Sequence, residues 1–140
     1  MTRAKRWTHL VALLAALLTG GTGSPQAGAH HSIAMFDGKR VIRISGTITG
    51  FRWINPHASI QLDGRGDDDA VASAWTVEMQ APSTLMAEGW SRESLSAGDR
   101  VTVFANPLRE GVASSGAQRG LYVGVVLPDG ATLGRTDGLR

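Results

Sequence analysis

Three histidines and one glutamate are the residues of this chain whose chemistry best suits a metal ion. His30 and His31 are adjacent near the N-terminus, His57 stands alone further along, and Glu78 lies in an otherwise apolar or neutral segment. Imidazole is the commonest metal-ligand side chain and suits copper, zinc and nickel. If a peptidase cuts after Ala29, the free amine of His30 becomes a further nitrogen ligand. We expect the three histidines to bind copper or zinc, with Glu78 as an oxygen ligand or as a partner that orients one imidazole.

The same residue types also permit an interpretation without a metal. His30 and His31 could be solvated on a frayed chain end, and His57 could hydrogen-bond a backbone carbonyl at the start of a strand. The three histidines that follow residue 29, without any cysteine, do not supply the four fixed ligands of a structural zinc site. The residue types therefore allow a metal, but their spacing does not require one.

A second group of candidates lies just before the third histidine. Arg52, Trp53 and Asn55 are expected to line a pocket at the mouth of a small barrel and to bind a small polar or anionic ligand. Ligand pockets commonly combine apolar walls with a few polar groups in this way. The alternative is that Phe51 or Trp53 fills the end of the barrel and that Asn55 and the following proline turn the chain. For the two aromatic residues, this structural alternative is the favoured one.

Catalytic motifs are missing from the sequence. It has no cysteine, no G-x-S-x-G nucleophile elbow, no H-E-x-x-H helix and no phosphate-binding glycine loop. The three aspartates at 67–69 lack the ligand spacing of a calcium loop and are expected to be solvated in a turn. We therefore expect a protein that is not an enzyme.

The N-terminus has the organisation of an export signal. Three basic residues precede an apolar stretch at 10–18, which is shorter than the ~20 residues of a membrane-spanning helix. Small residues at 27–29 match the A-x-A pattern that an export peptidase cuts behind, with cuts near Gly23 or Ser24 as alternatives. We expect residues 1–29 to be a Sec-type signal peptide and the mature protein to be periplasmic or secreted, without a membrane anchor. A lipoprotein is excluded because there is no cysteine.

This leader accounts for the net positive charge of the chain. Three of the fourteen Lys and Arg residues precede His30, whereas none of the twelve Asp and Glu residues does. Residues 30–140 therefore have a net charge of about −1, which makes nucleic acid a poor candidate partner. Because disulfides cannot form, the domain must be stabilised by its core.

Five segments after the leader show strand-like alternation or many β-branched residues between turn residues. The expected strands are residues 41–53, 57–62, 74–80, 101–104 and 121–127. A short helix is expected within 82–96, and the acidic run 63–69 is expected to be a turn. Gly46 and Gly50 fall on the apolar face of the first strand, where they permit a bend or a close backbone approach. This order predicts a mainly β fold, a five-stranded OB-like Greek-key barrel with a short helix between strands three and four, with a small β-sandwich as the alternative.

Short motifs spread over nearly the whole chain after the leader resemble those of a known family. The motifs are Ala29-His30-His31-Ser32, Phe36-Asp37, Gly46-Thr47-Ile48, Phe51-Arg52-Trp53-Ile54-Asn55-Pro56-His57-Ala58, Trp75-Thr76-Val77-Glu78, Pro82-Ser83-Thr84-Leu85, Gly89-Trp90, Gly98-Asp99-Arg100-Val101, Asn106-Pro107 and Leu127-Pro128-Asp129-Gly130. On these residues the chain resembles the DUF6152 family of small exported bacterial proteins of unknown function. The resemblance implies an exported domain with an OB-like fold and brings no established activity. The loop 64–70 departs from the family pattern.

We thus expect one exported domain at 30–133, followed by a flexible C-terminal tail at 134–140. Its expected function is to bind a metal ion or a small ligand. The alternative is a non-catalytic accessory protein that contacts a periplasmic enzyme or an electron-transfer partner. The sequence leaves the oligomeric state open.

Overall fold

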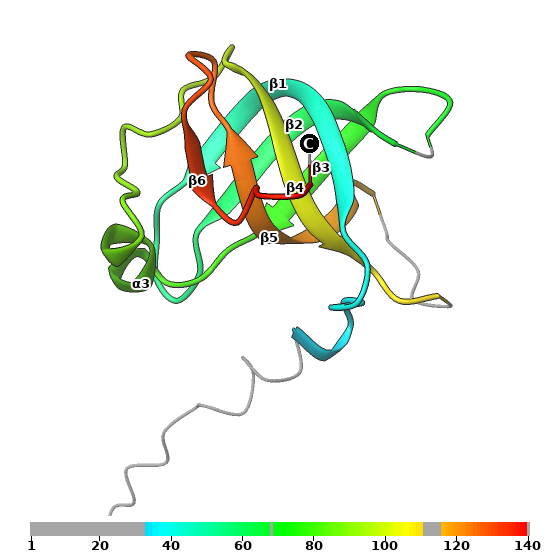
Figure 1. Ribbon diagram of the computed structural model, residues 1–140, viewed down its shortest axis with the longest axis horizontal. Coiled ribbons are helices and arrows are strands. Elements are labelled where there is room, and N and C mark those ends of the chain that lie inside the picture. The colour runs from blue at the N-terminus through cyan, green and yellow to red at the C-terminus, as the bar shows by residue number, and fades with distance from the viewer. Residues whose placement is uncertain (1–32, 68, 111–115, 140) are drawn as a thin grey trace, which may run out of the picture.

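The computed structural model describes residues 33–67, 69–110 and 116–139. Within these residues the chain forms six strands and one short helix (Figure 1). In chain order they are β1 (Ile42–Arg52), β2 (Ser59–Gly66), β3 (Ser73–Glu78), α3 (Pro82–Ala87), β4 (Arg100–Pro107), β5 (Gln118–Val126) and β6 (Thr132–Gly134). The expected signal peptide and the candidates His30 and His31 lie outside the described residues. Among the described helices, none is long and apolar enough to cross a membrane.

Strands β1 to β5 close into a barrel. β1 pairs antiparallel with β2 and β4, β2 pairs antiparallel with β3, and β4 pairs antiparallel with β5. A parallel pairing between β3 and β5 closes the ring. The predicted five-stranded barrel, with a short helix between its third and fourth strands, is confirmed. The β-sandwich alternative is wrong, because β3 and β5 pair directly instead of forming the edges of two separate sheets.

Alternating apolar side chains fill this barrel. Ile44 and Ile48 of β1, Ile60 and Leu62 of β2, and Val103 of β4 are at most 1% exposed. Successive side chains of a strand point to opposite faces, so the alternation in the sequence places these residues inside. Removal of apolar area from water contributes about 25 cal/mol per Å² and is the main stabilising contribution in a chain without disulfides.

Gly46 allows β1 and β2 to cross at close range. A Cβ atom at this position would contact the backbone oxygen of Asp63 and would lie 2.6 Å from the Cα of Gly64. A register shift between Ile48 and Gly50 interrupts the pairing further along β1. The close backbone approach expected at Gly46 is therefore confirmed.

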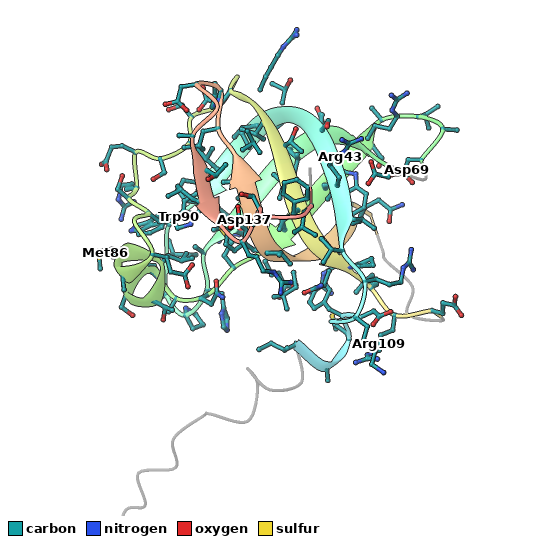
Figure 2. The ribbon with its side chains drawn as sticks, viewed as in Figure 1. Arg43, Asp69, Met86, Trp90, Arg109 and Asp137 are labelled. Atoms are coloured by element: carbon teal, nitrogen blue, oxygen red, sulfur yellow. The ribbon has the colours of Figure 1, made fainter. Side chains whose placement is uncertain are left out.

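The predicted turn at 63–69 is wrong over residues 63–66, which continue β2. Gly64 and Gly66 occupy the inward positions and are buried, so this part of the strand has no inward side chain and resembles a turn in the sequence. The turn begins at Asp67, whose carboxylate accepts hydrogen bonds from the N–H and the Nε of Arg43, both at 3.1 Å. Figure 2 shows Arg43 and the nearby Asp69 at this end of the barrel.

The residues after β5 fold back onto the barrel. β6, which the sequence pattern does not predict, pairs antiparallel with β5. Beyond it, the N–H of Arg135 donates to the carbonyl oxygen of Val123 at 2.9 Å, and Thr136 is 3% exposed. Figure 1 shows the chain after β6 crossing β5 and β4. The packed part of the chain therefore extends beyond the expected boundary at residue 133.

The C-terminal segment, residues 135–139, begins against the face of the sheet that carries Phe104. Phe104 of β4 pairs with Gly124 of β5, so the two residues face the same side of the sheet. A Cβ atom at Gly124 would lie 3.0 Å from Cγ2 of Thr136. Because Gly124 has no side chain, the C-terminal segment can approach this face, where Phe104 is 2% exposed.

Replacing Gly46 by alanine should lower the free energy of unfolding by about 1–3 kcal/mol, because the added methyl group must push β1 away from the backbone of β2. Gly38→Ala is the matched control, since a Cβ atom there has nothing within 4 Å. Its effect should stay within about 0.5 kcal/mol. Denaturant unfolding of both variants makes the comparison, and equal stabilities would contradict the close crossing of the strands.

Ending the chain after Gly134 should lower the free energy of unfolding by about 1–3 kcal/mol, the range for exposing one large apolar side chain, here Phe104. A chain that ends after Asp137 keeps the Arg135 hydrogen bond and Thr136, and serves as the control. Thermal unfolding followed by circular dichroism compares the two. If the shorter chain is as stable as the control, the C-terminal segment does not help to bury Phe104.

Candidate functional site

The chain that leads into β1 is anchored on the barrel. Phe36 is 2% exposed and forms an isolated β-bridge with Leu108. Next to it, the N–H of Asp37 donates to the carbonyl oxygen of Pro107 at 2.8 Å. The guanidinium carbon of Arg119 lies 5.8 Å from the centroid of the Phe36 ring, within the range of a cation–π contact. Phe36 thus holds the N-terminal arm, residues 33–40, against the barrel.

Arg109 holds the first residues of this arm. Its backbone N–H donates to the carbonyl oxygen of Met35, and its Nε donates to that of Ala34, each at 2.9 Å. Figure 2 shows Arg109 beside the start of the described chain. Ile33 follows directly from this anchored segment, although 54% of its surface is exposed. Its position matters because it is the described residue nearest in sequence to the two N-terminal histidines.

His57 is presented by the loop between β1 and β2. The loop contains a cis Asn55-Pro56 peptide bond, and the His57 side chain is exposed. The N–H of Ala58 donates to the carbonyl oxygen of Gln80 at 3.1 Å, and the N–H of Met79 donates to that of Ala58 at 3.0 Å. These two hydrogen bonds hold the His57 loop against the chain that leaves β3.

A cavity of about 110 Å³ lies where the N-terminal arm, the His57 loop and the two closing strands meet. Its walls are formed by Ile33, His57, Glu78, Met79, Gln80, Leu121 and Tyr122. Apolar walls with a few polar groups are typical of small-ligand sites. The structure thus brings together two of the four predicted metal-site residues, His57 and Glu78. His30 and His31 belong to the part of the chain that is not described.

Glu78 is engaged in an ion pair at this cavity. Its Oε1 accepts a hydrogen bond from Nη2 of Arg119. The parallel register explains this contact. It sets Glu78 opposite Leu121 and places Arg119 opposite Thr76, two residues along each strand and therefore on the same face of the sheet. The arginine offsets the negative charge, which makes Glu78 better suited to orient a neighbouring group than to bind a cation directly.

Within the described residues, no three His, Asp, Glu or Cys side chains gather closely enough to hold a metal ion. His57 is the only histidine in that part of the chain. A nitrogen-ligated metal at this cavity would therefore need further ligands from the residues before Ile33.

The ligand-binding candidates that precede His57 lie elsewhere. Arg52 and Asn55 are exposed, and neither they nor Trp53 line the cavity. Trp53 and Phe51 pack against the core, with their ring centroids 5.6 Å apart. Both aromatic residues are therefore half-buried against the core. A ligand site formed by Arg52, Trp53 and Asn55 stays a prediction.

Aromatic contacts continue from Phe51 to the cavity. Its ring centroid lies 5.7 Å from that of Trp90, and Trp90 meets Tyr122 edge-on at 5.4 Å. Nε1 of Trp90 donates a hydrogen bond to the hydroxyl oxygen of Tyr122 at 3.2 Å. Figure 2 shows Trp90 near α3 and β6. Because Tyr122 lines the cavity, this aromatic row ends at the cavity wall.

Burial raises the pKa of Tyr122 well above its usual value of about 10, because the phenolate would lose its hydration. The hydrogen bond from Trp90 acts in the opposite direction, and the negative charge of Glu88 adds to the rise. Tyr122 is therefore a neutral group at the cavity near pH 7 and supplies no phenolate.

Sequence reasoning missed Tyr122 because β5 is irregular. Alternation over 121–127 groups Leu121 with Val123 and Val125 on one face. In the structure Tyr122 is buried and Leu121 is half-buried, and a register shift in the β4–β5 pairing brings Val125 back inside. A strand pattern alone does not reveal such a bulge.

Arg119 and Ile33 were missed for another reason. Arg119 lies before the predicted strand, and Ile33 lies in a segment without periodicity. Only the tertiary pairing of β3 with β5 and the anchoring of Phe36 bring them to the cavity. The unbalanced charge of Glu78 on an apolar strand was the one available signal that a basic partner was needed.

The family model described as "Family of unknown function (DUF6152)" matches residues 19–118. The chain belongs to the DUF6152 family. The matched residues include the arm, the His57 loop, Glu78 and Met79, and end at the first residue of β5. Neither a curated protein nor a solved structure matches the chain. Family membership thus brings no activity, and the function must be inferred from the site.

Tyr122 is the single tyrosine of the chain, so its ionisation can be followed directly by ultraviolet absorbance. In the folded protein it should remain un-ionised at about pH 11, whereas the same chain in denaturant should titrate near pH 10. Because the unfolded state releases this proton first, the free energy of unfolding should fall as the pH rises above about 10. A native titration midpoint near pH 10 would contradict the burial of the hydroxyl group.

Proposed function

We propose that the mature protein, after export to the periplasm, is a non-catalytic module that binds a copper or zinc ion. The metal would be held at the cavity by nitrogen atoms of His30, His31 and His57. Cleavage after Ala29 would give His30 a free amine, so that this one residue could bind through its amine and its ring. Both nitrogen types bind metals in their deprotonated form.

The observation that carries this proposal is that Ile33 and His57 line the same cavity. A chain advances at most about 3.6 Å per residue, so the Cα of His31 lies within about 7 Å of the Cα of Ile33. By the same reasoning, the Cα of His30 lies within about 11 Å. Arg109 donates hydrogen bonds to the two residues that follow Ile33. The short chain from Ile33 back to His30 therefore starts from a fixed position. Covalent geometry alone would therefore allow the N-terminal histidines to reach the cavity.

The chemistry of the donors favours copper over zinc. Where the geometry of a site does not select the metal, a nitrogen-rich site binds Cu²⁺ more tightly than Zn²⁺. Glu78 takes the role of an orienting partner, because Arg119 already occupies its Oε1. An acidic neighbour of this kind can fix the orientation of a ligating imidazole.

Isothermal titration with copper and zinc tests the terminal amine. It compares mature protein that begins at His30 with the same protein whose N-terminal amine is acetylated. The blocked amine should weaken binding by at least about tenfold, since loss of even a supporting group at a metal site costs that much. Equal and weak affinities in the two forms would show that the amine is not a ligand.

A loop variant tests the third imidazole. His57→Ala should weaken metal binding by at least about tenfold without loss of stability, because the ring is exposed. Asn55→Ala is the matched control, since Asn55 is exposed on the same loop and does not line the cavity. If His57→Ala binds metal as tightly as Asn55→Ala does, His57 does not belong to the site.

A further inference from the structure

The Trp75 side chain carries a buried polar group that the described chain does not satisfy. It is 6% exposed, and its Nε1–H is buried without a hydrogen-bond partner among the residues that the structure describes. The indole of Trp90, by contrast, donates to the hydroxyl oxygen of Tyr122. Most buried donors in folded proteins are paired, because an unsatisfied donor loses its hydrogen bonds to water without replacement. The Trp75 indole is therefore available to a molecule that accepts a hydrogen bond.

This indole borders a cavity of about 170 Å³ at the end of the barrel where β1 begins and β2 ends. We call it the Trp75 pocket, and its walls are formed by Arg40, Ile42, Gly66, Asp67, Asp69, Trp75 and Pro107. A Cβ atom at Gly66 would lie 3.4 Å from Cζ2 of Trp75 and 2.8 Å from Oδ2 of Asp69. In an indole, Cζ2 and Nε1 are bonded to the same ring carbon. The ring edge that carries the N–H therefore lies close to Gly66 and to the carboxylate of Asp69.

The Trp75 pocket is larger than a bound water requires. A water needs about 10–15 Å³ of such space, whereas the pocket offers about 170 Å³. The pocket shares no wall residue with the His57 cavity. Its occupant is therefore independent of the proposed metal ion and can be a molecule of several non-hydrogen atoms.

The polar groups of the pocket favour a neutral ligand with hydroxyl groups. Asp67 accepts hydrogen bonds from Arg43, and Oδ2 of Asp69 accepts one from the N–H of Gly66 at 3.1 Å. A carboxylate has about four acceptor positions, so both can accept more. The two carboxylates repel an anion, and a metal cation has no lone pair to accept the indole proton. A hydroxyl group can accept from the indole and donate to a carboxylate with one oxygen atom.

From this arrangement we infer that the Trp75 pocket binds a sugar. One hydroxyl group of the sugar accepts a hydrogen bond from Nε1 of Trp75 and donates one to the carboxylate of Asp69. Ile42 and Pro107 contribute apolar wall against its carbon skeleton. Such a ligand is either a free monosaccharide or the terminal residue of a glycan, since both present the same hydroxyl groups.

Nuclear magnetic resonance of the ¹⁵N-labelled mature protein tests this inference through the indole N–H signals. The Trp75 signal is assigned by its absence from Trp75→Phe. D-Glucose, D-galactose and D-mannose are titrated, and at least one should shift the Trp75 signal with a dissociation constant of about 1 mM, as expected for a ligand of this size. The Trp90 signal should stay in place, because its N–H is already bonded to Tyr122. Sodium acetate should shift neither signal.

If no sugar shifts the Trp75 signal, or if acetate shifts it, the inference is wrong. A tetrasaccharide of the sugar that binds separates the two sources. Binding at least as tight as that of the monosaccharide identifies the end of a glycan as the ligand, and loss of binding identifies a free sugar.

A variant that fills the pocket gives a second measurement. Gly66→Ala adds a methyl group between the pocket walls, and the nearest atom is the end of the Asp69 side chain, which can move aside without disturbing the barrel. It should weaken sugar binding by at least about tenfold, the effect of one carbon atom too many in a fitted pocket. Gly38→Ala is the matched control and should bind as the parent does, since a Cβ atom there has nothing within 4 Å. Equal sugar affinities in the two variants would show that the sugar lies outside the Trp75 pocket.

Discussion

The parallel pairing of β3 with β5 is the constraint on which the rest of the structure depends. Without it, β1 to β5 would form an open sheet with two edges, and its inner face would be exposed to water. The pairing sets Glu78 opposite Leu121 and brings Arg119 within reach of the glutamate. It also sets the two strand walls of the cavity side by side. The same strand pairing therefore closes the barrel and forms the candidate site.

Two irregular segments add residues to the cavity that β3 and β5 form. The N-terminal arm is anchored by Phe36 and Arg109, and the His57 loop is hydrogen-bonded to the chain after β3. Each brings one residue, Ile33 or His57, to the same cavity. Loops on a rigid scaffold are common carriers of function, because the scaffold fixes their ends while their side chains remain free to bind. Here the scaffold also removes charge, since Arg119 offsets Glu78 before any ligand is present.

Local pattern predicted most of the barrel and only part of the site. Alternation located the strands, and the apolar phase of β1 identified Gly46 as a point of close approach, because both signals depend on neighbouring residues in the chain. β6 was not predicted because three residues are too few to show a period. The burial of Tyr122 was not predicted because a bulge reverses the alternation of β5. Arg119 was not predicted as a site residue because only the tertiary pairing of β3 with β5 brings it to its partner. His57 and Glu78 were predicted from their chemistry, but their sharing of one cavity follows from the fold.

The large sequence separation between paired strands also affects how fast the barrel can fold. Ile42 pairs with Ala105 and Trp75 with Gln118, so closure joins residues that are distant in the chain. Folds dominated by such non-local contacts fold in milliseconds to seconds, far more slowly than helical bundles, because the entropy of large loops is lost before the contacts form. For a chain that we propose to be exported, this delay favours passage across the membrane as an extended polypeptide. The arm, which needs β4 and β5 to anchor against, would then be among the last parts to settle.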